Sequence, residues 1–333
     1  MAAPRFDVLG IGNAIVDVIA RTDDDFLVAQ KMQKGGMALI DEARAKTIYD
    51  AMGPAMQISG GSAANTIAGV ASFGARAAFV GKVKDDEVGR IFRHDITKAG
   101  VTFDTKAATD GPATARSYIM VTPDGERTMN TYLGAAQNLH PDDIDEKQIA
   151  DAAITYLEGY LWDPTDAKDA FLKAAKIAHG ANRMVSLTLS DAFCVDRYRA
   201  EFAKLLRDGV IDLLFANEAE LKSLYETADF DTAVAALRKD ATLAAVTRSE
   251  KGCVVVSPEK VEAVPAAPIA KLVDTTGAGD LFAAGFLTGI ARGRDHVTAG
   301  KLGALAAAEV IQHLGARPET SLKTLAGNMG LAV

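Results

Sequence analysis

The second half of the chain alternates between short apolar strands and helices, and this alternation limits the possible folds more than any other feature. Strands that alternate with helices form a mostly parallel sheet with helices on both faces. We therefore predict an α/β protein, which Phe6–Leu9 opens with a further buried strand. The strands are expected at Ile154–Leu157, Met184–Leu189, Ile211–Phe215, Leu243–Thr247 and Cys253–Ser257. The helices are expected at Thr165–Ala178, Arg197–Leu206, Glu218–Glu226, Asp231–Lys239, Ala278–Arg292 and Val297–Leu314.

Extended segments in the first half fall outside this alternation. They are Ile15–Ala20, Met37–Ile40, Ala113–Thr122 and Arg127–Leu133. Pro123-Asp124-Gly125-Glu126 joins the last two and is a strong hairpin signal, whereas Thr22–Gly36 is charged and predicted to be mobile. We expect one catalytic domain over 1–333, with a small β-sheet lid formed by segments of about 14–40 and 112–134 that closes over a site.

Composition narrows the class of protein. An apolar share of 49% and a charged share of 24% are those of a soluble globular protein. The net charge of −8, without a basic cluster, argues against nucleic acid or an anionic membrane as a partner. No apolar stretch reaches the ~18 residues of a membrane span, and the few residues before Phe6 leave no room for a signal peptide. Cys194 and Cys253 lie in unrelated segments, which fits the reducing cytoplasm.

The segment Asp274-Thr275-Thr276-Gly277-Ala278-Gly279-Asp280 precedes an apolar helical run. Its glycines lie where a loop becomes a helix, and free N–H groups at a helix start attract anions. Asp280 in the first turn would lie beside the anion, where a carboxylate is well placed to accept a proton from an attacking hydroxyl. A Gly-rich connection with a helix-capping acid is the alternative.

This heptapeptide resembles the C-terminal signature of the ribokinase/PfkB family of carbohydrate and nucleoside kinases. The resemblance implies a ribokinase-like three-layer α/β/α fold and transfer of a phosphoryl group from ATP to a primary hydroxyl. It assigns Asp280 as catalytic base and Gly277, Ala278 and Gly279 as the anion hole for the transferred phosphate. It further implies Mg²⁺ as cofactor and allows for a monovalent cation such as K⁺.

A second glycine motif supports the same resemblance. Gly60-Gly61 leads directly into a helix that carries Asn65, and in this family the Gly pair and the Asn hold sugar hydroxyls. Asn13 and Asp17 follow the first strand, where open α/β sheets bind ligands. The resemblance places all of these residues around the acceptor. From the residues alone, an Asx turn and a solvated acid remain open for Asn13 and Asp17.

Two further segments are assigned to ATP. Asn217-Glu218-Ala219-Glu220 resembles the family's Asn-x-x-Glu motif, which orders Mg²⁺ through water, although Asn217 and Glu220 also fit an ordinary N-cap with an acid in the first turn. Thr247 and Gly252 match the next nucleotide-contacting loop. Ser249 stands where many relatives carry Gly, which leaves that loop's geometry open.

The acceptor is narrowed by a closer resemblance to adenosine kinases. Arg127 begins the run that ends in Leu133-Gly134-Ala135-Ala136, and in those relatives this Arg neutralises the transferring phosphoryl group. Met37, Leu39 and Leu133 would supply an apolar slot for a purine, or they form the lid's own core. Ribose, fructose or a 2-keto-3-deoxy sugar acid is the alternative acceptor.

Other classes of protein are less compatible with the sequence. Gly10-Ile11-Gly12-Asn13-Ala14-Ile15 lacks the third Gly of a dinucleotide fingerprint, Gly81-Lys82-Val83 is no P-loop, and the histidines show no zinc-ligand spacing. A non-catalytic nucleoside- or nucleotide-binding regulator stays open, although such a protein has no need of a base at Asp280. The long lid permits a monomer or a homodimer through the lid strands.

Overall fold

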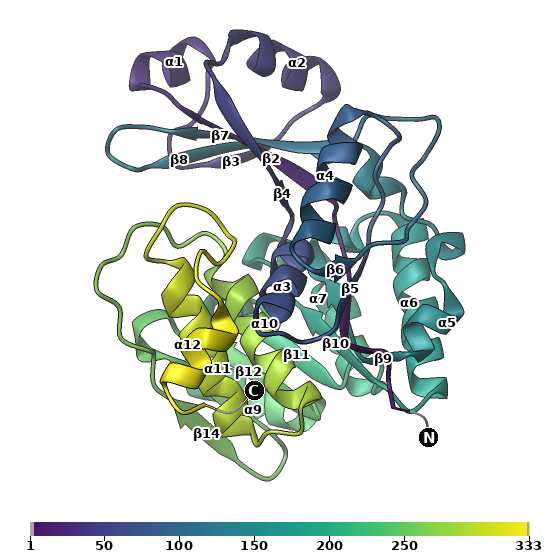
Figure 1. Ribbon diagram of the computed structural model, residues 1–333. Helices are drawn as coiled ribbons and strands as arrows, with labels where there is room; N and C mark the ends of the chain where they lie inside the picture. Colours follow the sequence, from purple (N-terminus) through teal and green to yellow (C-terminus); the bar gives the residue numbers. More distant parts are fainter. Residues whose placement is uncertain (1–2, 332) are drawn as a thin grey trace.

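A computed structural model describes residues 3–331 and 333 of the chain. Figure 1 shows a large α/β body and, above it, a smaller sheet that carries two helices on its outer side. The body and the small sheet are joined near the end of the first strand: β1 (Phe6–Ile11) belongs to the large sheet, and β2 (Ile15–Arg21) belongs to the small one. The residues between them, 12–14, therefore lie where the two parts meet.

The large sheet runs in the order β14-β13-β12-β11-β10-β9-β1-β5-β6. From β12 to β6 all neighbouring strands are parallel, and β13 and β14 form an antiparallel edge. The interior strands are buried along nearly their whole length, as expected for a sheet covered on both faces. Besides β1 the strands are β5 (Ala77–Val80), β6 (Val101–Thr102), β9 (Ala152–Glu158), β10 (Met184–Thr188), β11 (Leu213–Asn217), β12 (Leu243–Thr247), β13 (Cys253–Val256) and β14 (Val261–Val264).

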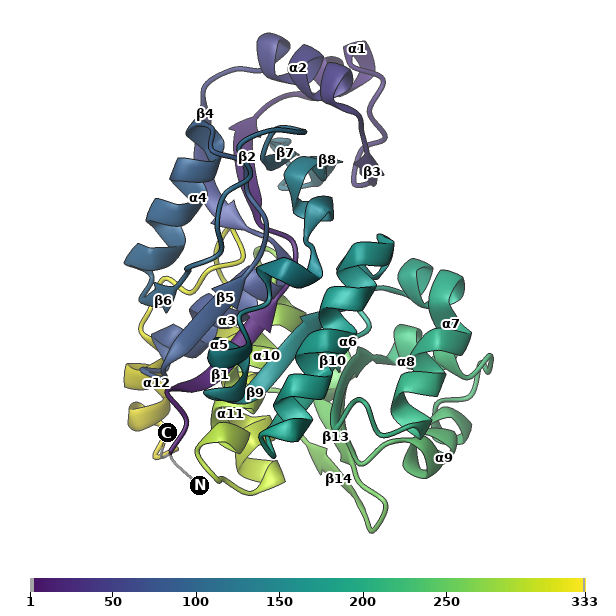
Figure 2. The same cartoon turned by 90° about the vertical axis from the view of Figure 1, so that its right-hand side faces the viewer.

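Two layers of helices cover this sheet, each with its own apolar core (Figure 2). One layer contains α3 (Ser62–Ser72), α10 (Ala278–Ala291), α11 (His296–Val310) and α12 (Leu322–Asn328). The other contains α5 (Glu146–Ala150), α6 (Thr165–Gly180), α7 (Ala192–Arg207), α8 (Glu218–Leu224) and α9 (Phe230–Asp240). Short 3₁₀ turns are η1 (Gly134–Asn138), η2 (Pro141–Asp143), η3 (Gly159–Trp162) and η4 (Ser249–Lys251). The three-layer α/β/α prediction is confirmed.

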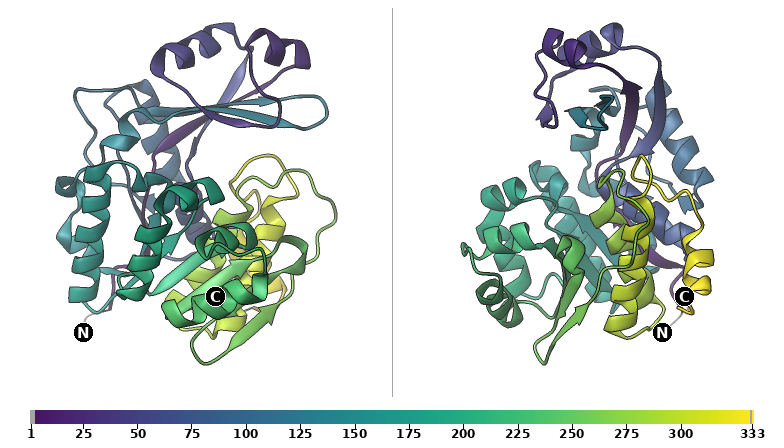
Figure 3. Two further views of the ribbon diagram at one scale, coloured as in Figure 1. Left: turned by 180° about the vertical axis from the view of Figure 1, so that it is seen from behind. Right: turned by 90° about the vertical axis from the view of Figure 1, so that its left-hand side faces the viewer.

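The small sheet has the order β3-β8-β7-β2-β4, and Figure 3 shows it above the body from two further sides. Its strands besides β2 are β3 (Met37–Leu39), β4 (Ala55–Gly60), β7 (Ala115–Val121) and β8 (Arg127–Tyr132), and the helices near it are α1 (Asp24–Ala29), α2 (Glu42–Ala51) and α4 (Glu87–Lys98). One face buries Val16, Val18 and Tyr118 in a core shared with α1 and α2. The opposite face carries Asp17, because side chains alternate along a strand.

Several elements were not predicted from the sequence, and three of the differences concern the small sheet and the last long helix. The small sheet includes β4, which we did not predict. Thr22–Gly36 contains α1, because the Asp23 side chain accepts a hydrogen bond from Phe26 N at 2.8 Å and caps the helix. The last long helix ends at Val310 rather than Leu314. Just beyond that end, Ile311 O accepts a hydrogen bond from Val273 N at 2.8 Å, which ties the segment before α10 to the end of α11.

Within the part of the chain that the structure describes, no helix is both long enough and apolar enough to cross a lipid bilayer.

Candidate active site

Asp280 lies in the first turn of α10 and is held by two side chains of α3. Ser62 Oγ donates to Asp280 Oδ1 at 2.7 Å, and Asn65 Nδ2 donates to Asp280 Oδ2 at 3.1 Å. The two glycine motifs, more than 200 residues apart in the sequence, thus meet at one carboxylate. A carboxylate offers about four lone-pair positions, so Asp280 can still accept a hydrogen bond from a hydroxyl of a bound molecule.

The glycine pair lies against Asn13 and Asp17. A Cβ added to Gly60 would stand 2.4 Å from Asp17 Oδ2, and one added to Gly61 would stand 2.2 Å from Asn13 O. Gly61 also has a φ of +97°, which side-chain-bearing residues rarely adopt. The sequence therefore needs glycine at both positions, and the structure brings all four residues to the junction of the large and small sheets.

Glu158, at the end of β9, is a further member of the site that the sequence analysis missed. Its Oε1 accepts from Asn13 Nδ2 at 2.6 Å, and its Oε2 accepts from Ala63 N at 2.8 Å. The side chain is buried, and a Cβ on Gly12 would clash with it. Its position was a usable signal, because an acid directly after a buried strand of an open α/β sheet lies at the ligand-binding edge.

Asn13 and Asn65 each leave one polar atom unused. From the sequence, both side chains are expected to be free for a ligand. In the structure, the Asn13 amide donates to Glu158 and the Asn65 amide donates to Asp280. Their Oδ1 atoms are buried and have no hydrogen-bond partner among the described residues. Buried unpaired acceptors are rare in native proteins, and these two mark places that a donor hydroxyl or water would satisfy.

Burial shapes the electrostatics of the acids. Burial raises the pKa of Asp280, against the lowering effect of its hydrogen bonds to Ser62 and Asn65. Burial likewise raises the pKa of Asp17 to about 7 and that of Glu158 to about 7. The Asp280 charge adds to both increases. Acids with pKa values moved toward neutrality are typical of functional sites.

Arg127 is paired with Asp274. Arg127 Nη2 lies 2.7 Å from Asp274 Oδ2, and both side chains are nearly buried. Asp274 also accepts from Thr276 N at 3.0 Å and Gly315 N at 3.0 Å, so it braces the loop that precedes α10. The resemblance to adenosine kinases predicts that Arg127 neutralises the phosphoryl group, and it gives no indication of this ion pair. The ion pair ties β8 of the small sheet to the glycine loop.

The glycine loop differs in one respect from the expected anion hole. Gly277 has a φ of +79° and caps α10, and a Cβ there would stand 2.7 Å from the Ala316 Cβ. The Ala278 N–H donates to Thr275 O at 3.2 Å, because residues 275–278 form a turn. Ala278 is therefore a weaker anion donor than expected, while Gly277 and Gly279 stay predicted donors at the helix start.

Asn217 and Glu220 form a capping box at the start of α8. Asn217 Oδ1 accepts from Glu220 N at 2.8 Å, and Glu220 Oε2 accepts from Asn217 N at 2.9 Å. The Asn217 amide also donates to Glu220 Oε1 at 2.5 Å. This is the ordinary helix-cap alternative that the sequence left open. Burial raises the pKa of Glu220 to about 7, and Asp191 adds to the increase.

The second nucleotide segment follows β12, whose last residue, Thr247, pairs with Asn217 of β11. Arg248 Nε donates to Glu218 Oε2 at 2.9 Å, and its guanidinium lies 3.8 Å from the centre of the Phe230 ring. Ser249 adopts a φ of +52°, the left-handed conformation that glycine favours. Gly252 has a φ of +81°, and a Cβ there would stand 2.1 Å from Val264 O. The turn therefore keeps a glycine-type backbone at Ser249.

The predicted apolar slot lies on the edge of the small sheet. Met37 is 51% exposed and Leu39 is 56% exposed. Both belong to β3, two residues apart, and they pair with Met129 and Thr131 of β8. By strand alternation these side chains share the face of Arg127 and Asp17. Leu133, just beyond β8, is half-buried. The alternative that Met37 and Leu39 form the lid's own core is wrong.

The residues present fit Mg²⁺ only as an indirectly held ion. Over the described part of the chain, no three His, Cys, Asp or Glu side chains are grouped as ligands for a metal ion. Both Glu220 oxygens are engaged by Asn217. Mg²⁺ commonly keeps several waters and is bound by substrate phosphates with one or two carboxylates. Glu220 would then act through water.

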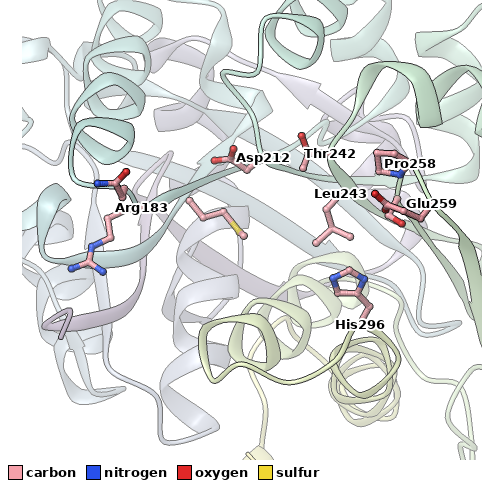
Figure 4. A pocket seen from close by; sticks show the side chains of 10 residues that line it. Arg183, Asp212, Thr242, Leu243, Pro258, Glu259 and His296 are labelled. Carbon is pink, nitrogen blue, oxygen red and sulfur yellow. The ribbon is translucent and has the colours of Figure 1, made fainter. Parts of the chain in front are cut away.

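A separate hollow of about 470 Å³ lies at the amino ends of the strands of the large sheet, away from the candidate active site (Figure 4). It is lined by residues at the amino ends of parallel strands, among them Met184 and Leu243, and by His296 at the start of α11. None of the predicted site residues lines it. Ligands of open α/β sheets bind at the carboxyl ends of the strands, so this hollow is not the candidate active site.

Several known proteins are similar to this chain in sequence and in fold. Residues 53–323 match the model of the pfkB family carbohydrate kinases. A solved structure of adenosine kinase from Sinorhizobium meliloti is 55% identical, with a TM-score of 0.91, over 98% of this chain and 99% of that one. A probable sugar kinase from Rhizobium etli is 53% identical, with a TM-score of 0.93, over 99% of this chain and 100% of that one.

A more distant relative is adenosine kinase from Saccharomyces cerevisiae, which is 28% identical over 95% of this chain and 96% of its own length. Proteins of this family are phosphotransferases that act on hydroxyl groups. The carboxylate of Asp280 at a helix start, the glycine pair and the family match over most of the chain lead to one assignment. This chain belongs to the pfkB family of carbohydrate kinases.

Proposed function

We propose that this kinase transfers the γ-phosphoryl group of ATP to the primary hydroxyl of a nucleoside, with adenosine as the preferred acceptor. The observation that carries the proposal is the meeting of Ser62, Asn65 and Asp280 beside the Asp17–Gly60 contact. The candidate base, Asp280, therefore lies at the same junction of the two sheets as the residues that we propose hold the acceptor.

In the proposed reaction the acceptor's hydroxyl oxygen forms a bond to the γ-phosphorus while the bond to the β–γ bridging oxygen breaks. The hydroxyl proton passes to Asp280, and ADP leaves. Asp17 holds two neighbouring hydroxyls of the acceptor, and Asn13 and Asn65 accept from hydroxyls through their unpaired Oδ1 atoms. Asn217, Glu220, Thr247 and Gly252 are the proposed ATP contacts.

Charge on the transferred group is balanced by the protein and by Mg²⁺, which would neutralise the phosphates when bound. Gly277 and Gly279 present their N–H groups at the start of α10. Arg127 would leave Asp274 and turn to the phosphoryl group. Closure of the small sheet over the acceptor excludes water.

The choice of adenosine has two supports. The Sinorhizobium meliloti and yeast relatives are both named adenosine kinase, and both align with nearly the whole chain. The exposed Met37 and Leu39 give the small sheet an apolar face suited to a purine base, which a free sugar does not need. The Rhizobium etli relative, a probable sugar kinase, favours a free sugar as second candidate.

The test is a comparison of kcat/KM for adenosine, ribose, fructose and a 2-keto-3-deoxy sugar acid, with ATP and Mg²⁺. The phosphorylated product is identified by mass spectrometry. We expect adenosine to have the highest value. A free sugar with a higher kcat/KM would assign the enzyme to the sugar kinases, and nucleotide binding without turnover on any acceptor would favour the regulator.

The apolar slot has its own test. Leu39→Ala should raise the KM for adenosine by roughly tenfold, the loss expected when a buried leucine contact is removed. Val28→Ala is the matched control, because Val28 is an exposed apolar residue of α1, 76% exposed. Equal KM values for both variants would remove Leu39 from the slot.

A further inference from the structure

Arg317 is a half-buried cation next to the glycine pair, and no motif in the sequence points to it. Its Nε and Nη2 donate to Ser59 O at 3.2 and 2.9 Å, and Nη2 also donates to Ser59 Oγ at 3.2 Å. Ser59 directly precedes Gly60, whose Cα lies against Asp17. Arg317, from the segment after α11, therefore holds the end of β4 just where the small sheet enters α3.

Arg317 also faces the acids of the site. Asp17 and Asp280 both interact with its charge, and that interaction lowers the pKa of each against the effect of burial. Burial lowers the pKa of Arg317 itself to about 10, while the same acids and Asp95 oppose the decrease. The Nη1 atom of Arg317 is buried without a hydrogen-bond partner among the described residues.

The charged and titratable groups around this cluster come from several elements. Facing Arg317 are Asp17 of β2, Asp95 of α4 and Asp280 of α10. Facing Asp17 or Asp280 are Arg127 of β8, Glu158 and Tyr156 of β9, and Tyr160 of η3.

We propose that Arg317 is a positioning residue of the phosphoryl transfer, which holds the Gly60–Gly61 turn through Ser59 and favours the ionised forms of Asp17 and Asp280. This inference rests on the proposed function, in which Asp280 is the base and Asp17 binds the acceptor. The role is distinct from that of Arg127, whose charge is already neutralised by Asp274.

The physical need for this cation follows from burial. Two neighbouring carboxylates that are partly withdrawn from water repel one another and tend to take up protons, which would disable both a base and a hydroxyl acceptor. A nearby guanidinium offsets that cost. Arginine suits the position because Nε and Nη2 together hold Ser59 in a rigid fork. The single ammonium group of a lysine cannot reproduce this geometry.

The experiment is the pH dependence of kcat/KM for Arg317→Gln against the wild type. A nearby cation lowers the pKa of a carboxylate, so its removal raises the pKa and shifts the acid limb of the profile upward. A shift of one unit lowers kcat/KM by about tenfold on that limb. Near pH 9, where the acids ionise without help, the loss should shrink to the pH-independent loss that Arg317→Lys also shows, because both variants lack the fork on Ser59. A loss of the same factor at every pH would overturn the proposal, since a merely structural role produces that result.

Two further variants complete the design. Arg292→Gln is the matched control, because Arg292 bonds to Asp7 and Gly74, at the far end of β1, and its profile should match the wild type. Arg317→Lys retains the charge but loses the fork, so it should keep the wild-type acid limb with a raised KM for the acceptor. If Arg317→Gln fails to fold, the lysine variant decides: an acid limb shifted upward by a unit or more contradicts the proposal.

Failure of this inference is distinguishable from failure of the proposed function. Asp280→Asn tests the base directly and does not involve Arg317. An inactive Asp280→Asn enzyme, together with a pH-independent loss in Arg317→Gln, rejects the role of Arg317 alone. A fully active Asp280→Asn enzyme rejects the proposed function.

Discussion

The proposed acceptor half and the proposed nucleotide half of the site are built differently. The acceptor half gathers Asn13, Asp17, Glu158 and Asp280 from three distant parts of the chain, and it leaves two buried carboxamide oxygens unpaired. The proposed nucleotide half pairs residues that are closer together in the sequence. Asn217 and Glu220 satisfy one another within one helical turn, and Arg248 is engaged by Glu218 and Phe230.

This difference indicates which part of the site would gain more stability from a bound ligand. Buried acids with raised pKa values and unpaired acceptors cost stability in the free protein, and a bound polyol would recover part of that cost. Polar groups that already cap a helix stabilise the free protein and have less to gain. We therefore expect substitutions in the acceptor half to change function most and those in the nucleotide half to change mainly stability.

The largest effect is expected for Asp280→Asn. Without its base, turnover should fall by on the order of 10²-fold or more, while substrate binding stays nearly intact because the amide is the same size as the carboxyl. Steady-state kcat and equilibrium binding of the nucleoside measure the two effects separately. Normal turnover by this variant would rule out the base role.

Asp17→Asn should weaken the acceptor half while stabilising the free protein above neutral pH. We expect the acceptor KM to rise by roughly tenfold or more, because a charged hydrogen-bond acceptor is lost. The pKa of Asp17 is raised from 3.8 to about 7 in the folded state. The stabilising effect of the protonated acid is therefore lost as pH rises through about 7.

Thermal unfolding of both proteins across a range of pH measures this effect. The Tm of Asp17→Asn minus that of the wild type should be near zero below about pH 4 and largest above about pH 7. A difference in Tm that does not change with pH would show that Asp17 is not a buried acid in solution.

Gly61→Ala tests the close packing of the acceptor half. Its Cβ would stand 2.2 Å from Asn13 O at a φ of +97°, so the turn must shift. We expect a loss of about 1–3 kcal/mol in the free energy of unfolding, together with a raised acceptor KM. Gly53→Ala is the control, because no atom lies within 4 Å of the added Cβ. Chemical denaturation of both variants checks the prediction, and equal stabilities would contradict it.

The smallest effect is expected for Ser249→Gly in the nucleotide half. Ser249 has a φ of +52°, a conformation that costs a side-chain-bearing residue about 1 kcal/mol and glycine almost nothing. Glycine also gives the unfolded chain more freedom, so the net gain in stability should be below about 1 kcal/mol. The value of kcat should not change. A large change in the KM for ATP would contradict the expectation that substitutions in this half change mainly stability.

Much of the fold follows from the sequence, because strand-helix alternation and helix caps are local signals. The parallel strands from β9 to β12 lie close to the predicted ranges, and the two glycine motifs begin helices as expected. Strand β4 was missed because much of it is exposed and carries no clear apolar alternation. Helix α1 was missed because its cap was read as part of a charged, mobile segment.

The sequence by itself therefore determined the α/β class, the two glycine motifs and the identity of Asp280 as the candidate base. Only the tertiary structure decided that Glu158 holds Asn13, that Asp274 pairs with Arg127, and that Arg317 lies beneath Ser59. These contacts join residues that are about 145 to 258 positions apart. No local pattern encodes such pairs, since each depends on how two separately folded segments pack against one another.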